Sequence, residues 1–104
     1  MKRGSAMVNG MIIDAKDNVG VVIEPVKKGS KIVYLDSNKN VVEISAVDDI
    51  KIYHKFAVRN IEEDQPIVKY GEHIGLAAYP IQQGAHVHVH NVKSVREDLE
   101  HREV

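Results

Sequence analysis

KIVYLDSNKNVVEISA, residues 31–46, is the stretch of sequence that decides the fold class. Two runs rich in β-branched residues, at 31–36 and 41–46, flank the polar segment 37–40. Val and Ile are stiff at χ1 and favour extended backbone, and Asn tolerates the positive φ angles of tight turns. The stretch therefore predicts a β-hairpin whose turn lies at residues 37–40.

The same chemistry extends along the whole chain. Val and Ile account for 16 and 11 of the 104 residues, against three Leu. Short β-branched runs are separated by polar residues, Gly or Pro, which is typical of strands joined by hairpins and corners. A mainly β domain is expected, with runs at 11–14, 19–24, 31–36, 41–46, 50–53, 55–61, 67–70, 73–78 and 86–92.

A second pattern recurs three times, as PVKKGSKI (25–32), NIEEDQPI (60–67) and PIQQGAHV (80–87). Each segment has an aliphatic residue, two polar residues, a turn-forming residue and a further aliphatic residue that starts the next run. We expect strand corners held by the two aliphatic side chains, with Gly29, Asp64 and Gly84 adopting the difficult backbone angles. Chance recurrence of common turn residues is the alternative. The irregular period excludes a solenoid.

Length and composition limit the function classes. A chain of 104 residues, 43% apolar and 28% charged, builds one domain. The net charge of −1 provides no basic field for nucleic acid or an anionic membrane. Cysteine is absent, which excludes disulfides and thiolate nucleophiles. No apolar stretch is long enough to span a membrane and no signal peptide is visible, so we expect a soluble cytoplasmic protein.

The two ends differ in composition from the expected domain at 8–93. Residues 1–7 include GSAM at 4–7, which resembles a cloning remnant, with Met7 as an alternative native start. Residues 94–104 are dominated by charged side chains. Ser94 and Glu97 have capping-box spacing, which favours a short C-terminal helix. A frayed end or the stub of a linker is an equal alternative.

Three of the six histidines, His86, His88 and His90, alternate with valines. On a strand these three side chains share one face, about 6.5–7 Å apart at about 3.3 Å per residue. Such a row can chelate a metal ion, orient an anion or transfer protons near neutral pH. The alternative is a solvated strand face on which the histidines are ordinary polar residues.

Other candidates lie at the ends of predicted strands. His54 and Lys55 precede an apolar run, and alternation places them on opposite faces unless the strand bends there. Lys69 precedes a Tyr-Gly turn and is suited to pairing with a carboxylate, although lysines near turns are usually solvated. We interpret the pair at 17–18, Asp-Asn, as an Asx turn that introduces the next strand.

Four motifs occur in an order that resembles a known family: DNV at 17–19, HKFAV at 54–58, IVKYG at 67–71 with IG at 74–75, and GAHVHVHN at 84–91. Over residues 11–93 the chain is similar to the N-terminal SAF domain of altronate and galactarate dehydratases. The resemblance implies a β-clip fold related to antifreeze proteins and to the C-terminal module of sialic acid synthases. In this family the SAF domain is fused to a large catalytic domain or encoded as a small subunit, as in sulfolactate sulfo-lyase.

The resemblance also implies a lyase that uses a divalent metal, such as iron(II), and acts on hydroxy acids. It would remove water from a sugar acid, breaking a carbon–oxygen bond, or sulfite from sulfolactate, breaking a carbon–sulfur bond. At position 53 this chain has Tyr, where the family usually has Gly. The family motifs carry over as catalytic candidates to His54, Lys55, Lys69, Tyr70 and Asn91, and as metal ligands to His88, His90 and, less directly, His86.

The large catalytic domain is missing from the sequence, so we expect the chain to be inactive alone and to need a large catalytic subunit. The leading hypothesis is a SAF-type small subunit, or isolated N-terminal domain, of a sugar-acid dehydratase or hydroxy-acid lyase. The alternative is a stand-alone, non-enzymatic SAF module that binds a sugar acid or a metal. A third hypothesis is a homo-oligomer formed through exposed strand edges.

Overall fold

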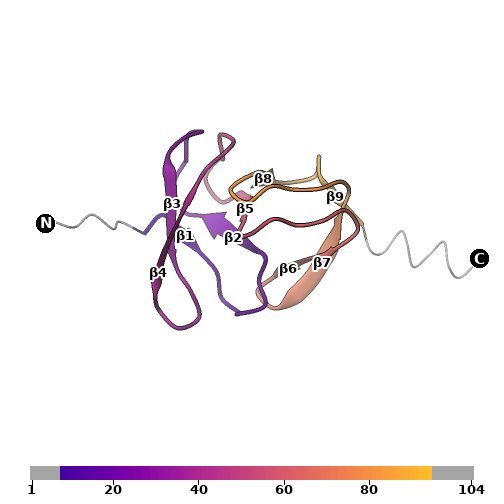
Figure 1. The fold of residues 1–104 in the computed structure, drawn as a ribbon, viewed down its shortest axis with the longest axis horizontal. Helices are drawn as coiled ribbons and strands as arrows, with labels where there is room; N and C mark the ends of the chain where they lie inside the picture. The colour runs from indigo at the N-terminus through magenta and orange to yellow at the C-terminus, as the bar shows by residue number, and fades with distance from the viewer. Residues whose placement is uncertain (1–7, 95–104) are drawn as a thin grey trace, which may run out of the picture.

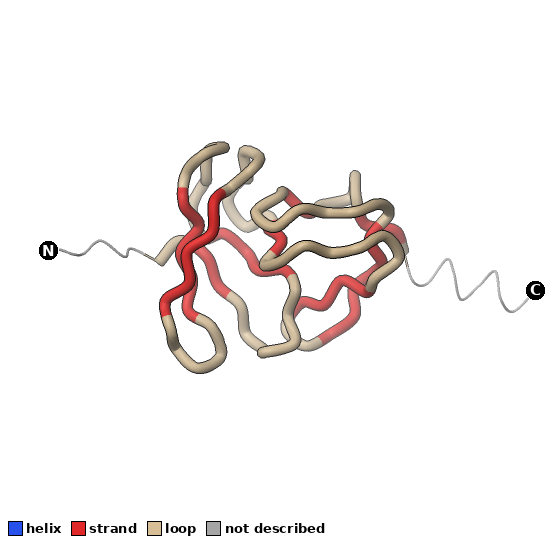
Figure 2. Tube along the Cα trace, viewed as in Figure 1, coloured by secondary structure: helices blue, strands red, loops and turns tan. Residues whose placement is uncertain are grey.

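The computed structural model describes residues 8–94, which form nine short strands and no helix (Figures 1 and 2). All strand pairs are antiparallel, in three sheets. The prediction of a mainly β fold with short strands and hairpins is confirmed. The sheets are β1 (Gly10–Met11), β2 (Val19–Val22), β5 (Lys55–Ala57) and β8 (His86–Val87); β3 (Lys31–Leu35) and β4 (Val41–Ser45); and β6 (Pro66–Lys69), β7 (Glu72–Ala77) and β9 (Val92–Lys93).

The hairpin predicted at residues 31–46 is formed by β3 and β4, in register from Lys31 opposite Ser45 to Leu35 opposite Val41. Its turn is closed by Asp36, whose Oδ1 accepts hydrogen bonds from the backbone N–H groups of residues 38 and 40, both at 2.8 Å. The positive φ angle belongs to Lys39 (67°), and not to either asparagine as the turn chemistry suggested. The cap by Asp36 fixes the loop tightly enough to hold a lysine in that conformation.

The recurring segments form corners of the predicted kind. An aliphatic residue forms an isolated β-bridge to a second corner, as between Ile61 and Ile81. Three residues after the bridging aliphatic, the chain enters the left-handed region at Gly29 (φ 91°), Asp64 (68°) and Gly84 (86°). The shared pattern was therefore a structural signal and not chance.

A fourth corner occupies residues 50–53, where the sequence predicted a strand. Ile50 bridges Val26, and Tyr53, three residues later, has a φ angle of 67°. The Tyr53 N–H donates to Val22 O at 2.8 Å and the His54 N–H donates to Lys51 O at 2.9 Å, which closes the corner. The strand prediction was wrong because these long-range bonds outweigh the β propensity of the segment.

The core has two clusters, one beneath each long hairpin, and β5 lies between them. Side chains alternate on β5, so Phe56 belongs to the cluster of β3–β4 and Ala57 to the cluster of β6–β7. Figure 1 shows β3–β4 at one end of the long axis, β6, β7 and β9 at the other, and β5 with β8 between. Residues drawn from both halves therefore meet around β5 and β8.

The helix expected from Ser94 onward falls on residues 95–104, which lie outside the described part of the chain. Within residues 8–94 there is no helix of the length and apolar character needed to cross a membrane.

Candidate functional site

A cluster of histidines lies where the two halves meet. His54 Nδ1 is 2.9 Å from His86 Nε2, and one ring nitrogen from each of His54, His86 and His88 lies within 4.8 Å of the others. The rings of His54 and His88 stack with centroids 4.3 Å apart. His54 comes from the corner at 50–53, and the other two come from β8 and the turn after it. Pairing of β5 with β8, which sets Phe56 opposite His86, brings these segments together.

The run at 86–92 is not one strand. β8 ends at Val87, and a turn at 88–91 leads into β9. Asn91, which is only 4% exposed, closes this turn: its Oδ1 accepts from the His88 N–H at 2.9 Å and its Nδ2 donates to His86 O at 2.8 Å. The structure therefore gives Asn91, a catalytic candidate in the sequence, contacts that position His86 and His88.

The row of three histidines on one strand face does not form as predicted. His90 lies in the turn, with its ring centroid 5.1 Å from that of His86. Its carbonyl oxygen accepts a hydrogen bond from the Tyr79 hydroxyl at 3.2 Å. Among the described residues, the group whose ligand atoms converge is His54, His86 and His88. His54 thus takes the place that the sequence gave to His90.

The chemistry of this donor set fits a divalent transition metal. Imidazole is a common ligand of zinc, copper, iron and nickel. The ring nitrogens of His54 and His86 are 2.9 Å apart, and one ring nitrogen of His88 lies within 4.8 Å of both. These three nitrogens are close enough together that they would hold one divalent cation.

The surroundings favour neutral imidazoles. Desolvation, followed by the neighbouring His90, His54 and His88, lowers the pKa of His86. The pKa of His88 is also lowered, by desolvation and then by His54, Lys55, His90 and Lys51. A neutral imidazole is the form that binds a metal or accepts a proton. His86 and His88 therefore keep that form to a lower pH than a free histidine would.

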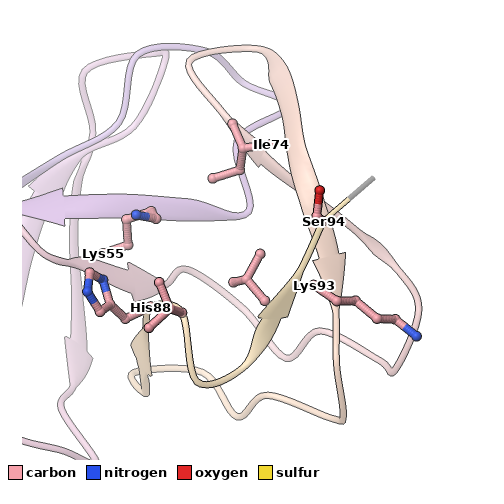
Figure 3. A pocket seen from close by; sticks show the side chains of 7 residues that line it. Lys55, Ile74, His88, Lys93 and Ser94 are labelled. Atoms are coloured by element: carbon pink, nitrogen blue, oxygen red, sulfur yellow. The ribbon is translucent and has the colours of Figure 1, made fainter. Parts of the chain in front are cut away.

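A pocket of about 300 Å³ adjoins the cluster (Figure 3). Lys55 and His88 form its polar wall, and Ile74 faces them from β7. Burial, and then the charge of Lys69, lowers the pKa of Lys55. His54 lies in the corner before β5, and therefore both His54 and Lys55 approach His88, despite the alternation expected on a continuous strand. The lining residues are Lys55, Ile74, His88, Val89, Val92, Lys93 and Ser94.

Lys69 and Tyr70 lie at the tip of the β6–β7 hairpin and do not line the pocket. The Lys69 Nζ is 4.9 Å from the centroid of the Tyr70 ring. Tyr70 (φ 55°) and Gly71 (φ 78°) form a two-residue turn in the left-handed region. Lys69 acts on the site through its charge, which reaches Lys55.

Asp17 and Asn18 hold this hairpin, a role that the Asx-turn interpretation missed. Asp17, 1% exposed, accepts from the Gly71 N–H at 2.7 Å and from the N–H groups of residues 13 and 14. Asn18 donates to Pro66 O and accepts from the Val68 N–H. The Asx turn belongs to Asp14, whose Oδ1 accepts from residue 16. Two adjacent polar residues before a buried strand were the available signal, but their partners lie about 50 residues away.

Comparison with known proteins agrees with this arrangement. Residues 8–95 match the altronate/galactarate dehydratase SAF domain. The chain is 38% identical over 91 residues to the (2R)-sulfolactate sulfo-lyase subunit alpha of Chromohalobacter salexigens, covering 86% of this chain and 97% of that subunit.

A second relative has a different architecture. The chain is 39% identical over 88 residues to the altronate dehydratase of Bacillus subtilis, covering 85% of this chain but 17% of the dehydratase. It thus corresponds to a whole small subunit in one relative and to a short region of a much longer protein in the other. The chain belongs to the altronate/galactarate dehydratase SAF domain family.

Proposed function

We propose that this chain is the small SAF-type component of a lyase that acts on 2-hydroxy acids together with a larger catalytic chain. The observation that carries the proposal is the three-histidine cluster open to a pocket with a lysine wall. The near-complete coverage of a sulfo-lyase subunit alpha supports a subunit role, and the short match within a dehydratase supports a larger catalytic partner.

The substrates in the relatives' names indicate the substrate class. Sulfolactate and altronate are both 2-hydroxycarboxylates with a heteroatom group on C3, a sulfonate in one and a hydroxyl in the other. In a β-elimination the C2 proton passes to a base, and the C3 group leaves with its bonding electrons as sulfite or as water after protonation. The resulting enol rearranges to a 2-oxo acid. The reaction needs a cationic site for the carboxylate and groups that move protons.

The residues at the site match those needs. The Lys55 ammonium at the pocket wall is placed to pair with the substrate carboxylate. His88, held by Asn91, presents an imidazole to the same pocket, and its free ring nitrogen can accept a proton there when it holds no cation. His54, His86 and His88 would hold a divalent cation, which when bound would supply Lewis-acid polarisation of a substrate oxygen.

Metal binding is tested on the chain alone by calorimetric titration with Mn²⁺, Fe²⁺ under anaerobic conditions, and Zn²⁺. His54→Ala and His88→Ala should each weaken binding at least about tenfold, because each removes one of three ligands. His73→Ala is the matched control, since His73 is an exposed histidine on β7 outside the cluster. Absence of binding by the wild-type chain, or equal loss in all three variants, would contradict the metal role.

Lyase activity is tested by assaying sulfolactate and altronate with this chain, with the large chain that co-purifies with it, and with the mixture. Activity in the mixture alone is the expected result. His88→Ala should remove it and His73→Ala should preserve it. Binding of a sugar acid or a metal without turnover in any mixture would instead support a non-enzymatic binding module.

A further inference from the structure

The corner beside His54 differs from the other three corners of the fold. At the equivalent position the other corners have Gly29, Asp64 and Gly84, residues that adopt positive φ at low cost. The fourth has Tyr53, for which a φ of 67° is strained. Strained residues cluster at functional sites, so the Tyr53 side chain is a candidate for a role of its own.

The Tyr53 side chain gains nothing from the protein's own core to offset this strain, because the residue is 71% exposed. Its neighbour Ile52 is also exposed. The tip of the turn at 88–91 carries Val89, which is 81% exposed and separates His88 from His90. Because the His54 and His88 rings stack on each other, the corner at 50–53 and the turn at 88–91 lie close together at the cluster. Three exposed apolar side chains therefore flank the histidines.

Charged side chains of both signs lie beside this patch. The lysines that act on His88 are Lys51 and Lys55, and Lys55 lines the pocket. The Asp48 Oδ2 accepts from the His86 N–H at 2.9 Å, and its charge also acts on His86. A protein surface that covers this patch must therefore offer apolar contact in the middle and a carboxylate opposite Lys51 at the rim.

We infer that the docking surface for the larger catalytic chain consists of Ile52, Tyr53 and Val89. Binding there places the histidine cluster against that chain. The inference rests on the proposed function, which supplies that chain as the occupant. The complementary surface on the larger chain is apolar, with a carboxylate opposite Lys51. Docking there encloses the pocket beside Lys55 and excludes water from it, which strengthens the electrostatic interactions inside.

The experiment measures the affinity of the purified large chain, identified by lyase activity in the mixture, for immobilised variants of this protein. Tyr53→Gly and Val89→Ser should each weaken association at least tenfold, and Tyr53→Phe should bind like the wild type because it keeps the ring. Tyr53→Gly should melt no lower than the wild type, since glycine relieves the backbone strain. Lys39→Gly is the matched control, because it relieves the same strain in the turn of the far hairpin and leaves the patch intact.

The outcomes separate the two proposals. If no large chain with lyase activity associates with the wild type, the proposed function fails and the docking surface fails with it. If the wild type associates and Tyr53→Gly and Val89→Ser bind equally well, the docking surface is wrong while the function stands. If sedimentation shows a dimer of the wild type alone that Tyr53→Gly converts to a monomer, a second copy is the occupant and the inference is overturned.

Discussion

The two halves of the molecule have the same plan but are stabilised in different ways. Each is a hairpin, β3–β4 or β6–β7, closed at its base by a bridge between two corners. The first hairpin caps its own turn with Asp36. The second is held from outside, by Asp17, Asn18 and strand β9. The second half, which depends on distant segments, also supplies His86 and His88. The site therefore lies on the half whose hairpin needs contacts from the rest of the chain.

The common plan extends to the core. Ile32 and Ile67 each lie six positions after the bridging aliphatic of their corner, and both are fully buried. Ala46 and Ala77 each lie four positions before the second bridging residue, and each carbonyl accepts a hydrogen bond from the N–H at the left-handed position of the opposite corner. Substitutions at equivalent positions can therefore measure how the two halves differ.

The largest difference is expected between Gly84→Ala and Gly29→Ala. A Cβ at position 84 would clash with the backbone carbonyl of Ser45, whereas a Cβ at position 29 meets nothing within 4 Å. Gly84→Ala should lower the free energy of unfolding by more than about 4 kcal/mol, or prevent folding. Gly29→Ala should cost about 1–2 kcal/mol, from positive φ alone. Urea denaturation measures both, and equal costs would show that the corner at 81–84 is not locked against β4.

The next largest difference is expected between the two turn-holding aspartates. Asp17→Ala leaves three partly buried N–H groups without their acceptor and should cost about 3 kcal/mol. Asp36→Ala opens a solvent-accessible turn and should cost about 1 kcal/mol. Denaturation curves of the two variants give the comparison. A larger cost for Asp36→Ala would reverse the conclusion that the second hairpin depends more on outside contacts.

The same aspartate makes the second half sensitive to acid. Burial alone would raise the pKa of Asp17, but hydrogen bonds from Asp14, Ile13, Gly71 and Tyr70 together lower it below its usual value. The stabilisation is therefore complete above the unfolded pKa of about 3.9 and is lost as the pH falls through the folded pKa. The gap in stability between the wild type and Asp17→Asn should shrink from pH 7 to pH 3. A gap that does not change with pH would contradict the ionised state.

The smallest effects are expected at Lys39 and Asp64, two of the exposed left-handed residues that are not glycine. Lys39→Gly relieves strain without removing a contact and should raise the free energy of unfolding by about 1 kcal/mol. Asp64→Gly should change the free energy of unfolding little. Aspartate already tolerates positive φ, so glycine relieves little strain, and the ion pair with Lys93 that is lost is exposed and contributes little. Thermal melting of the two variants tests this order. A higher melting temperature for Asp64→Gly than for Lys39→Gly would contradict it.

The fold class and three of the four corners were predictable because their signals are local. Alternating β-branched runs and Gly or Asp at fixed spacing act within a few residues of one another. The corner at 50–53 was not predictable in this way. Its residues have strand propensity, and its conformation follows from bonds to Val22 and Val26, more than 20 residues earlier.

The site was predictable as a set of residue types but not as a geometry. The spacing of His86 and His88 indicated a segment that the structure brings into the histidine cluster. The turn imposed by Asn91 and the arrival of His54 beside them depend on the pairing of β5 with β8, which no local pattern encodes. Asn91 was identified through family resemblance, and its contacts with the backbone became visible only in the folded chain.

The separation of His54 from His86 along the chain has a consequence for folding during synthesis. The 31 residues between them contain the whole β6–β7 hairpin and both of its corners. In a chain leaving the ribosome, the first half is complete in sequence while the second is still being made, because synthesis begins at the N-terminus. The histidines can meet only after the second half has closed on β5, so the finished cluster marks a chain whose two halves have both folded.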